Sequence, residues 1–284
     1  MNLCDYDSIR ELLARHGFHF SKSMGQNFLI DPAVPAAIAD ASEADKGCGV
    51  LEIGPGIGPL TAELAARAGR VVSVELDKAL LPVLAETMAP YSNVEIVPGD
   101  VMKLDLAKLA EEKLSGLRPI VCANLPYNIT TPVLTKLVET PCFESITVMI
   151  QKEVAERLGA EPGNKDYGAI TLSINYYSDA NIVMTVPASC FMPRPNVDSA
   201  VIRMDIYDKP PVATKDEVKM FKVIKAAFSQ RRKTLVNSVS SSTDIAKETI
   251  LKSLNEMGLS ESVRGETLSL EQFAELSDRI IENS

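Results

Sequence analysis

Short apolar segments with strand character alternate with longer helical segments along most of the chain, and no other feature limits the possible folds so strongly. Strands are expected at residues 49–54, 70–76, 94–100, 119–124 and 145–151. Helices are expected between or after them at residues 59–69, 79–89, 130–139 and 152–160. Strands that are separated by helices pair in parallel through right-handed crossovers. The sequence therefore predicts an α/β fold with a mainly parallel sheet.

A change in composition marks the end of this pattern. Two later segments, at 170–178 and 199–206, alternate in polarity and are expected to be strands. The segment DKPPVATKDE at 208–217 then combines adjacent prolines with polar residues, as linkers do. Helical periodicity follows to the end of the chain, with a predicted apolar stripe formed by Val218, Phe221, Ile224, Ala227 and Phe228. We therefore predict an α/β domain over residues 1–209 and a small all-α domain over residues 210–284.

Several classes of protein are disfavoured by the composition. No apolar run approaches the roughly 20 residues that a membrane-spanning helix needs. The 5 cysteines are scattered without a CxxC pair, so neither a disulfide framework nor a zinc site is indicated. The 2 histidines are too few for a multi-histidine metal site. We expect a cytoplasmic protein without a metal and without a membrane partner.

A glycine-rich turn and two carboxylates follow three successive predicted strands. The stretch LEIGPGIG at 51–58 ends the first strand and opens a helix, and its Gly54 and Gly56 allow a ligand to approach the backbone closely. Its spacing is GxGxG, whereas a dinucleotide fingerprint has GxGxxG. Glu75 ends the second strand, where a carboxylate can accept hydrogen bonds from a ribose diol, and Asp100 ends the third. The three strand ends together predict a site for a nucleoside-bearing cofactor.

The fourth predicted strand ends in the sequence Asn124-Leu125-Pro126-Tyr127. Proline cannot donate to a sheet ladder, so the strand must stop there. An amide and an aromatic ring are therefore exposed at the same edge of the sheet as the glycine turn. Such an edge is where parallel sheets bind their ligands.

These motifs together resemble those of S-adenosylmethionine-dependent N6-adenine methyltransferases. The stretches GQNFLID (25–31), FMPRPNVDS (191–199) and FSQRRKTL (228–235) narrow the resemblance to the KsgA-type rRNA adenine N6,N6-dimethyltransferases. The resemblance implies a Rossmann-like S-adenosylmethionine-dependent methyltransferase sheet with a small C-terminal all-α domain. It also implies that residues 1–209 bind the cofactor and catalyse transfer, while residues 210–284 contact RNA or the ribosome.

The family's usual reaction is the N6,N6-dimethylation of two adjacent adenosines in a hairpin loop near the 3′ end of small-subunit rRNA, during ribosome biogenesis. S-adenosyl-L-methionine is the implied cofactor. The implied partner is small-subunit rRNA, within a preassembled small ribosomal subunit, and a monomer is expected. A single-stranded loop suits such a reaction, because its bases are easily splayed out of the stack.

Roles for individual residues follow from the same resemblance and from the chemistry of the base. Asn124 Oδ1 and a main-chain carbonyl at Leu125 or Pro126 can accept the two N6–H bonds, so that the nitrogen lone pair faces the methyl group. Tyr127 offers a face for the flipped base, and Phe191 is implied as a second stacking wall. The implied cofactor-binding residues are Gln26, Asn27, Leu29, Gly54, Gly56, Glu75, Asp100 and Asn124.

The net charge of −9 is unusual for a protein that binds RNA, because phosphate binding relies on Lys and Arg. The candidate RNA-binding residues are Arg231, Arg232, Lys233 and Arg194, with Lys22, Lys152 and Arg157 as further candidates. A basic run at a helix end can equally complement the helix dipole. Weak intrinsic affinity for RNA, with an assembled ribosomal particle as substrate, would reconcile the charge with the function.

The same motifs leave three other functions to consider. A large-subunit rRNA methyltransferase of the antibiotic-resistance kind shares the NLPY motif, but the FxPxPxVxS and SQRRKTL elements favour the small-subunit enzyme. A ribosome-assembly checkpoint would not need the Asn, Pro, Tyr and acidic residues. A nicotinamide dehydrogenase is disfavoured by the GxGxG spacing.

Overall fold

The computed structural model describes residues 2–19 and 26–284, and the chain forms two compact units. The first, here called the sheet unit, runs through Glu156 and includes Asp179–Ile206. The second, the helical unit, consists of Arg157–Ser178 and Tyr207–Ser284. The segment 157–178 therefore packs with the C-terminal helices, although we expected it within a domain over residues 1–209.

The strands are β1 (Phe28–Leu29), β2 (Cys48–Ile53), β3 (Arg70–Glu75), β4 (Val94–Pro98), β5 (Arg118–Asn124), β6 (Ser145–Gln151), β7 (Ser178–Val186), β8 (Phe191–Met192) and β9 (Ser199–Ile206). The α-helices are α1 (Tyr6–Arg15), α2 (Ala33–Ala41), α3 (Pro59–Arg67), α4 (Leu81–Thr87), α5 (Leu106–Lys113), α6 (Thr130–Val138), α7 (Lys152–Leu158), α8 (Ala169–Tyr177), α9 (Glu217–Ser229), α10 (Leu235–Ser242), α11 (Lys247–Glu256) and α12 (Leu270–Glu282). Among the described residues, no helix is both long and apolar enough to cross a membrane.

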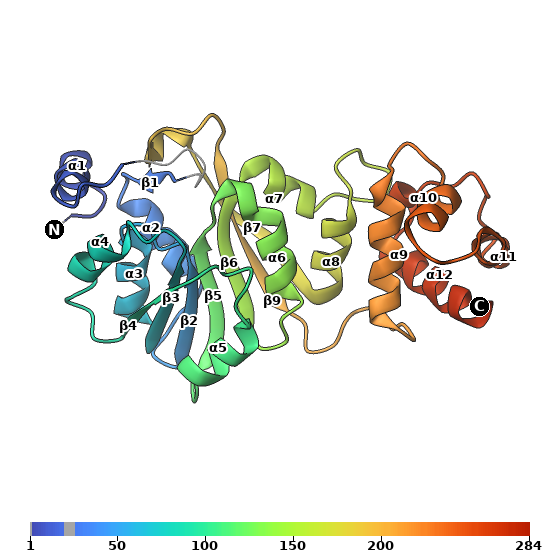
Figure 1. The fold of residues 1–284 in the computed structure, drawn as a ribbon, viewed down its shortest axis with the longest axis horizontal. Helices are drawn as coiled ribbons and strands as arrows, with labels where there is room; N and C mark the ends of the chain where they lie inside the picture. The colour runs from blue at the N-terminus through green and yellow to red at the C-terminus, as the bar shows by residue number, and fades with distance from the viewer. Residues whose placement is uncertain (1, 20–25) are drawn as a thin grey trace. The chain divides into compact units, whose positions relative to one another are not determined.

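The central sheet has 7 strands in the order β4-β3-β2-β5-β6-β9-β7 (Figure 1). Strands β2 to β6 pair in parallel, as predicted, whereas β9 is antiparallel to β6. The order reverses between β2 and β5, because the chain first adds β3 and β4 on one side of β2 and then adds β5 on the other. In open α/β sheets, such a switch point leaves a crevice at the carboxyl ends of the strands.

Apolar side chains bury both faces of the sheet. On one face, Val50 and Val71 pack with Ile38 of α2 and Leu64 of α3. Leu51 and Val72 point to the opposite face, where they meet α5. Alternation of neighbouring residues between the faces is the geometric consequence of the strand's two-residue period. Because both faces are covered, the strands read as continuous apolar runs.

A short antiparallel pair joins two segments that lie far apart in the sequence. Leu29 of β1 pairs with Phe191 of β8, and Phe28 pairs with Met192. Ile30 N also donates to Cys190 O at 2.9 Å. The GQNFL and FMPRP motifs are therefore neighbours in the fold, a contact that the sequence analysis did not predict.

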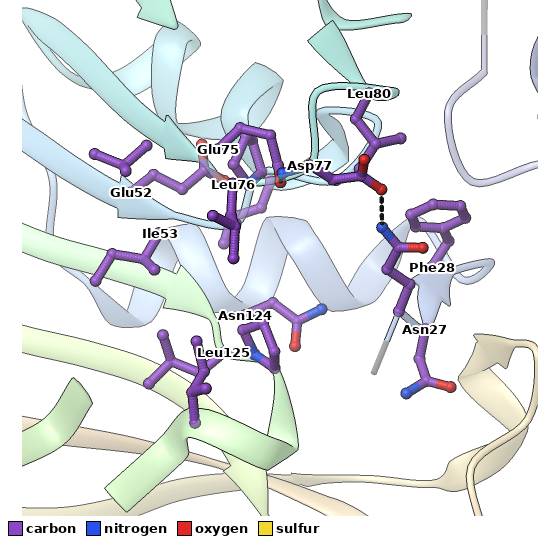
Figure 2. Close-up of a pocket in the computed structure, with 18 of the residues that line it drawn as sticks. Asn27, Phe28, Glu52, Ile53, Glu75, Leu76, Asp77, Leu80, Asn124 and Leu125 are labelled. Carbon is purple, nitrogen blue, oxygen red and sulfur yellow. Dashed lines mark hydrogen bonds between the residues drawn. The ribbon is translucent and has the colours of Figure 1, made fainter. Parts of the chain in front are cut away.

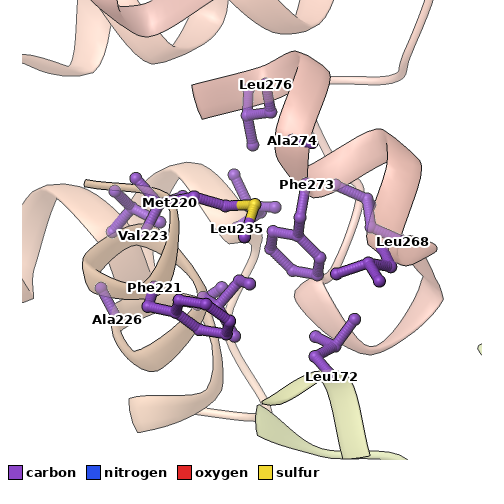
Figure 3. Packing of buried hydrophobic residues seen from close by; sticks show 14 of the residues in the cluster. Leu172, Met220, Phe221, Val223, Ala226, Leu235, Leu268, Phe273, Ala274 and Leu276 are labelled. Carbon is purple, nitrogen blue, oxygen red and sulfur yellow. The ribbon is translucent and has the colours of Figure 1, made fainter. Parts of the chain in front are cut away.

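The helical unit has its own core, shown in Figure 3. Met220, Phe221 and Val223 of α9 are buried against Leu235 of α10 and Phe273 of α12. The predicted apolar stripe on α9 is confirmed at Phe221, Ile224 and Ala227, which are buried, but is wrong at Val218, which is 81% exposed. Met220, which was not part of the predicted stripe, is fully buried.

The expected strand at 170–178 is wrong. Residues 169–177 form α8, and the strand β7 begins only at Ser178. Gly168 caps this helix, since its N–H donates to Thr171 Oγ1 at 3.2 Å. Leu172 and Tyr176, four residues apart, both enter the helical core. Most residues of the segment are apolar, and the first of them alternate between apolar and polar side chains. This alternation resembles the two-residue period of a strand, so the sequence did not indicate a helix.

Glu52 is a buried carboxylate that ties three elements of the sheet unit together. It lies in β2, and its Oε2 accepts hydrogen bonds from Thr61 of α3 at 2.7 Å and from Ser73 of β3 at 2.6 Å. Burial raises the pKa of the Glu52 carboxyl to about 7, from an ordinary value near 4.5. The folded protein therefore holds this proton more tightly than the unfolded chain does.

We predict that Glu52→Gln changes the pH dependence of stability. The stabilisation from protonated Glu52 is complete below pH 4.5 and is lost as the pH rises to about 7, because the buried charge must then form. This loss amounts to about 3 kcal/mol. Urea unfolding measures the free energy of unfolding of the variant and of wild type at both ends of this range. The difference, variant minus wild type, should increase by that amount as the pH rises from 4.5 to about 7.

Glu95→Gln is the matched control, because contacts with Lys113 and Arg70 lower the pKa of the Glu95 carboxyl. The contribution of the Glu95 ion pairs is fully present above pH 4.5 and is lost only as the pH falls below it. The stability of Glu95→Gln relative to wild type should therefore stay nearly constant from pH 4.5 to about 7. Parallel curves for wild type and Glu52→Gln would contradict the prediction.

Candidate functional site

The candidate site lies at the switch point of the sheet. The first residue after β2 is Gly54, and the last residue of the adjacent parallel strand β5 is Asn124. Parallel strands end at the same edge, so the glycine loop and the NLPY turn face each other across the crevice. Gly54 N continues the ladder by donating to Val74 O at 2.9 Å, and Gly99 N does so with Glu75 O at 2.9 Å.

One pocket of about 1110 Å³ occupies this crevice, its open mouth included (Figure 2). All the residues predicted to act in catalysis or cofactor binding line it. They are Gln26, Asn27, Leu29, Gly54, Gly56, Glu75, Asp100, Asn124, Leu125, Pro126, Tyr127 and Phe191. The predicted RNA-binding residues are not among its lining residues.

Glycine is favoured at two positions in the loop between β2 and α3, because the backbone is left-handed at both. Gly54 has φ of 67°, a left-handed conformation that other residues rarely adopt. Gly58 has φ of 95°, and a Cβ there would lie 2.4 Å from Met88 Cε. The loop therefore presents bare backbone to the pocket and turns directly into α3.

The carboxylates of the pocket have distinct surroundings. Glu75 is buried, which raises the pKa of its carboxyl, and its Oε1 accepts a hydrogen bond from Asp77 N at 2.7 Å. Asp77 Oδ2 in turn accepts from Gln26 Nε2 at 2.7 Å (Figure 2). Asp100 Oδ1 accepts from Met102 N at 2.9 Å. The Glu75 carboxylate also interacts with the backbone N–H groups of Gly56 and Leu76, and Asp100 Oδ2 pairs with Lys103 at 3.7 Å. Backbone contacts therefore hold both carboxylates in place at the pocket.

The NLPY turn presents an amide and a main-chain carbonyl to the pocket. Figure 2 shows the Asn124 side chain projecting into the cavity from the end of β5. The Pro126 carbonyl is already engaged, since it accepts from Ile129 N and from Thr130 Oγ1, both at 3.2 Å. Of the two carbonyls considered from the sequence, that of Leu125 is therefore the better candidate acceptor.

Two aromatic side chains complete the wall near the turn. Tyr127 lines the pocket, and burial raises the pKa of its hydroxyl. Phe191 also lines it, from β8, at the position paired with Leu29. The β1–β8 pair thus brings the GQNFL and FMPRP motifs to the same cavity as the NLPY turn.

Several lining residues were missed by the sequence analysis. Leu76, directly after Glu75, is 52% exposed and projects into the pocket (Figure 2). Val101 directly follows Asp100 and also lines the pocket. An apolar residue directly after each strand-ending acid was visible in the sequence and could have been read as a wall for a flat ring.

The predicted basic residues have different environments. Arg231 is engaged within the helical unit, where its Nη2 donates to Lys165 O at 2.6 Å and to Tyr167 O at 3.0 Å and pairs with Glu266 at 3.4 Å. It therefore holds the 165–167 segment of that unit. Arg232 and Lys233 are exposed.

The remaining basic candidates lie elsewhere in the chain. Arg194 is exposed in the loop after β8. Lys152 pairs with Glu156 at 3.8 Å, and Arg157 is only partly exposed. Lys22 lies outside the described residues. Within the described ranges, no group of three or more His, Cys, Asp or Glu side chains is arranged to hold a metal ion.

Comparisons with known sequences support this arrangement of motifs. The family model described as "Ribosomal RNA adenine dimethylase" matches residues 17–282. A protein named "Ribosomal RNA small subunit methyltransferase A" from Geobacillus thermodenitrificans is 49% identical over 277 residues, which is 96% of this chain and 94% of that protein. A protein of the same name from Lachnoclostridium phytofermentans is also 49% identical, over 96% of this chain and 95% of its own length.

Solved structures agree with the fold. A dimethyladenosine transferase from Plasmodium falciparum superposes with a TM-score of 0.70 at 24% identity, covering 87% of this chain and 95% of that one. The 23S rRNA methyltransferase ErmE superposes with a TM-score of 0.64 at 26% identity, covering 89% of this chain and 99% of its own. With a family match over nearly its whole length and relatives about half identical to it, the chain belongs to the ribosomal RNA adenine dimethylase family.

Proposed function

We propose that the protein transfers methyl groups from S-adenosyl-L-methionine to the N6 of adenines in small-subunit rRNA, and that the crevice at the β2–β5 switch point is where this happens. One observation carries the proposal. The glycine loop, the Glu75 carboxylate and the Asn124 amide line a single pocket, at the ends of three neighbouring strands. A nucleoside cofactor and an aminopurine therefore find their typical protein partners within one cavity.

The residues present fit this cofactor. Glu75 accepts from Asp77 N at 2.7 Å and also interacts with the backbone N–H groups of Gly56 and Leu76. A carboxylate has about four acceptor sites, so it can still accept from a ribose hydroxyl. The bare backbone at Gly54 and Gly56 leaves room for close approach. Leu76 and Val101 provide apolar faces for a flat ring, and Asp100 can accept from its amino group. When bound, the cofactor supplies a methyl group that is activated by a positively charged sulfur.

The acceptor side of the pocket orients the target nitrogen. The N6 lone pair of adenine is delocalised into its ring, so the amine is a poor nucleophile. Asn124 Oδ1 and the Leu125 carbonyl would accept its two hydrogen bonds, because the Pro126 carbonyl is engaged within the turn. These two hydrogen bonds would favour a pyramidal nitrogen with its lone pair directed toward the methyl group. The alkylated amine loses its proton readily, so no strong base is required.

Two aromatic rings would hold the base while this happens. Tyr127 and Phe191 both line the pocket, from the NLPY turn and from β8. Stacking on an aromatic side chain contributes about 1–3 kcal/mol per base. The base must first leave its stack, which is easiest in a single-stranded loop.

The finer features of the proposal come from the family. They are two adjacent adenosines in a hairpin loop near the 3′ end of the rRNA, each receiving two methyl groups, and a preassembled small subunit as substrate. We propose that the protein acts as a cytoplasmic monomer.

A large-subunit target is the main alternative, because ErmE is described as a 23S rRNA methyltransferase and has a similar fold. The relatives at 49% identity are named as small-subunit enzymes, which favours the first target. Mapping of dimethylated adenines in both rRNAs after incubation with the protein would discriminate between the two.

Asn124→Ala should lower the rate of methyl transfer to small ribosomal subunits by on the order of 100-fold, as loss of a transition-state hydrogen bond does elsewhere. If the main role of the Asn124 side chain is at N6 and its contribution to the cofactor site is secondary, the affinity for S-adenosylmethionine, measured by calorimetry, should change little. Asn181→Ala, on the exposed part of β7, is the control and should transfer methyl groups normally. Unchanged turnover in Asn124→Ala would refute the proposed hydrogen bond between N6 and Asn124 Oδ1.

Glu75→Ala should weaken the binding of S-adenosylmethionine by about 10- to 100-fold, because a hydrogen bond to a charged group contributes about 1.5–3 kcal/mol. Calorimetric titration measures this directly. The matched control is Glu63→Ala on α3, an acid whose contact is with Arg67. Equal affinities for wild type and Glu75→Ala would remove Glu75 from the cofactor site.

The basic run should separate into structural and RNA-binding residues. Arg231→Ala should lower the melting temperature, because two carbonyls and Glu266 lose their partner. Arg232→Ala and Lys233→Ala should leave it unchanged, weaken binding to small-subunit rRNA, and each reduce the log–log salt slope by about 1. Lys252→Ala, a lysine 63% exposed on α11, is the control. An unchanged slope in both variants would exclude this run from phosphate binding.

A further inference from the structure

We propose that Ser199 is a positioning residue, which holds the ring of Tyr127 in place as a wall of the base-binding pocket. The inference rests on the proposed function, since the ring has a base to stack on only if an adenine enters. It connects the last residue of the FxPxPxVxS motif with the last residue of NLPY.

The contact between the two side chains is short, and one of its two partners is fully buried. Tyr127 Oη and Ser199 Oγ lie 2.7 Å apart, and either hydroxyl can donate. Ser199 is 0% exposed, and the Tyr127 side chain is partly buried while its residue lines the pocket. A buried hydroxyl without a partner is costly, so each of these groups depends on the other.

The topology explains why residues so distant in sequence meet. The parallel strands β5 and β6 end at the same edge of the sheet, and Leu125 N extends their pairing by donating to Met149 O at 3.1 Å. β9 runs antiparallel to β6, so β9 begins where β6 ends, and Ser199 is paired with Gln151. The start of β9 is thereby brought to the edge where the NLPY turn lies.

The hydrogen bond holds the far end of the ring. The near end is fixed by the turn itself, in which the Pro126 carbonyl accepts from Ile129 N and Thr130 Oγ1. A tyrosine side chain has two rotatable bonds, and its hydroxyl oxygen lies on the axis of the second. Tethering the hydroxyl therefore restricts rotation about the Cα–Cβ bond, which decides where the ring lies. The ring is held in one place before a base arrives, and the ordering cost of binding is lower. The hydroxyl is directed to Ser199, so its role is to orient the ring.

The residue before Ser199 fixes the segment that carries the second aromatic wall. Asp198 Oδ1 accepts a hydrogen bond from Ala188 N at 2.9 Å. This bond closes the 188–198 loop, which contains Phe191. Asp198 O also accepts from Lys152 N at 3.0 Å, which attaches the base of the loop to the end of β6. Ser199 is thus anchored on both sides and forms a rigid attachment point.

The test compares Tyr127→Phe, Ser199→Ala and the double variant in methyl transfer to undermethylated small ribosomal subunits. Each single change removes the same hydrogen bond, so each should lower kcat/KM for subunits by about 2- to 10-fold, mainly through KM. The double variant should lose no more than the singles, because they share one interaction. Affinity for S-adenosylmethionine should stay at the wild-type value in all three.

Tyr127→Ala, which removes the ring as well, should lose about 5- to 150-fold beyond Tyr127→Phe. Two variants control for a structural effect alone. Tyr167→Phe removes a buried tyrosine hydroxyl that donates to Leu268 O, and Ser42→Ala removes a buried serine hydroxyl that donates to Ala39 O. Both variants should have a lower melting temperature and an unchanged KM for subunits.

Three results would overturn the inference. They are wild-type KM in both single variants, losses that add up in the double variant, or equal KM changes in the two controls. Absence of methyl transfer by the wild-type protein, with intact cofactor binding, would instead overturn the proposed function, and this inference with it. Methyl transfer by the wild-type protein therefore distinguishes failure of the proposed function from failure of the Ser199 inference alone.

Discussion

The parallel pairing of β2 with β3 on one side and β5 on the other is the constraint on which the site depends. It forces the crossovers after β2 and before β5 to diverge, so the carboxyl ends of β2 and β5 border an open crevice. Gly54 and Asn124 stand on opposite sides of that crevice only because of this order. If β5 were added beyond β4, the glycine loop and the amide would lie three strands apart.

A second set of contacts closes the crevice around its ligand. The β1–β8 pair carries Asn27, Leu29 and Phe191 to the pocket from segments separated by most of the sheet unit. The antiparallel β9 adds Ser199 beneath Tyr127. The ends of the parallel strands form only one side of the binding site. The antiparallel pair β1–β8 and the antiparallel strand β9 supply its other walls.

The acidic total is consistent with a substrate that is an assembled particle. Many of the cations are neutralised locally, as Arg67 is by Asp40 and Glu63, and as Arg203 is by Glu43 and Asp205. Counterion release from exposed lysines and arginines drives most non-specific RNA binding, and each local ion pair of this kind reduces that contribution. Weak attraction to bare RNA would make recognition depend on shape and on the splayed base.

The sequence by itself determined the parallel sheet, the glycine turn, the strand-ending acids and the NLPY turn, because each depends on residues that are close together in the chain. It also indicated the family. It failed at 170–178, where an apolar helix resembles a strand, and at Val218, which lies exposed in the first turn of α9. Only the tertiary structure decided that the Pro126 carbonyl is hydrogen-bonded within the turn, that Arg231 binds the carbonyls of the 165–167 segment, and that Ser199 contacts Tyr127. The Arg231 and Ser199 contacts join residues far apart in sequence, and strand order, which no local pattern encodes, brings Ser199 to Tyr127. The engaged carbonyl depends on the exact backbone course of the turn, which its residue types alone do not give.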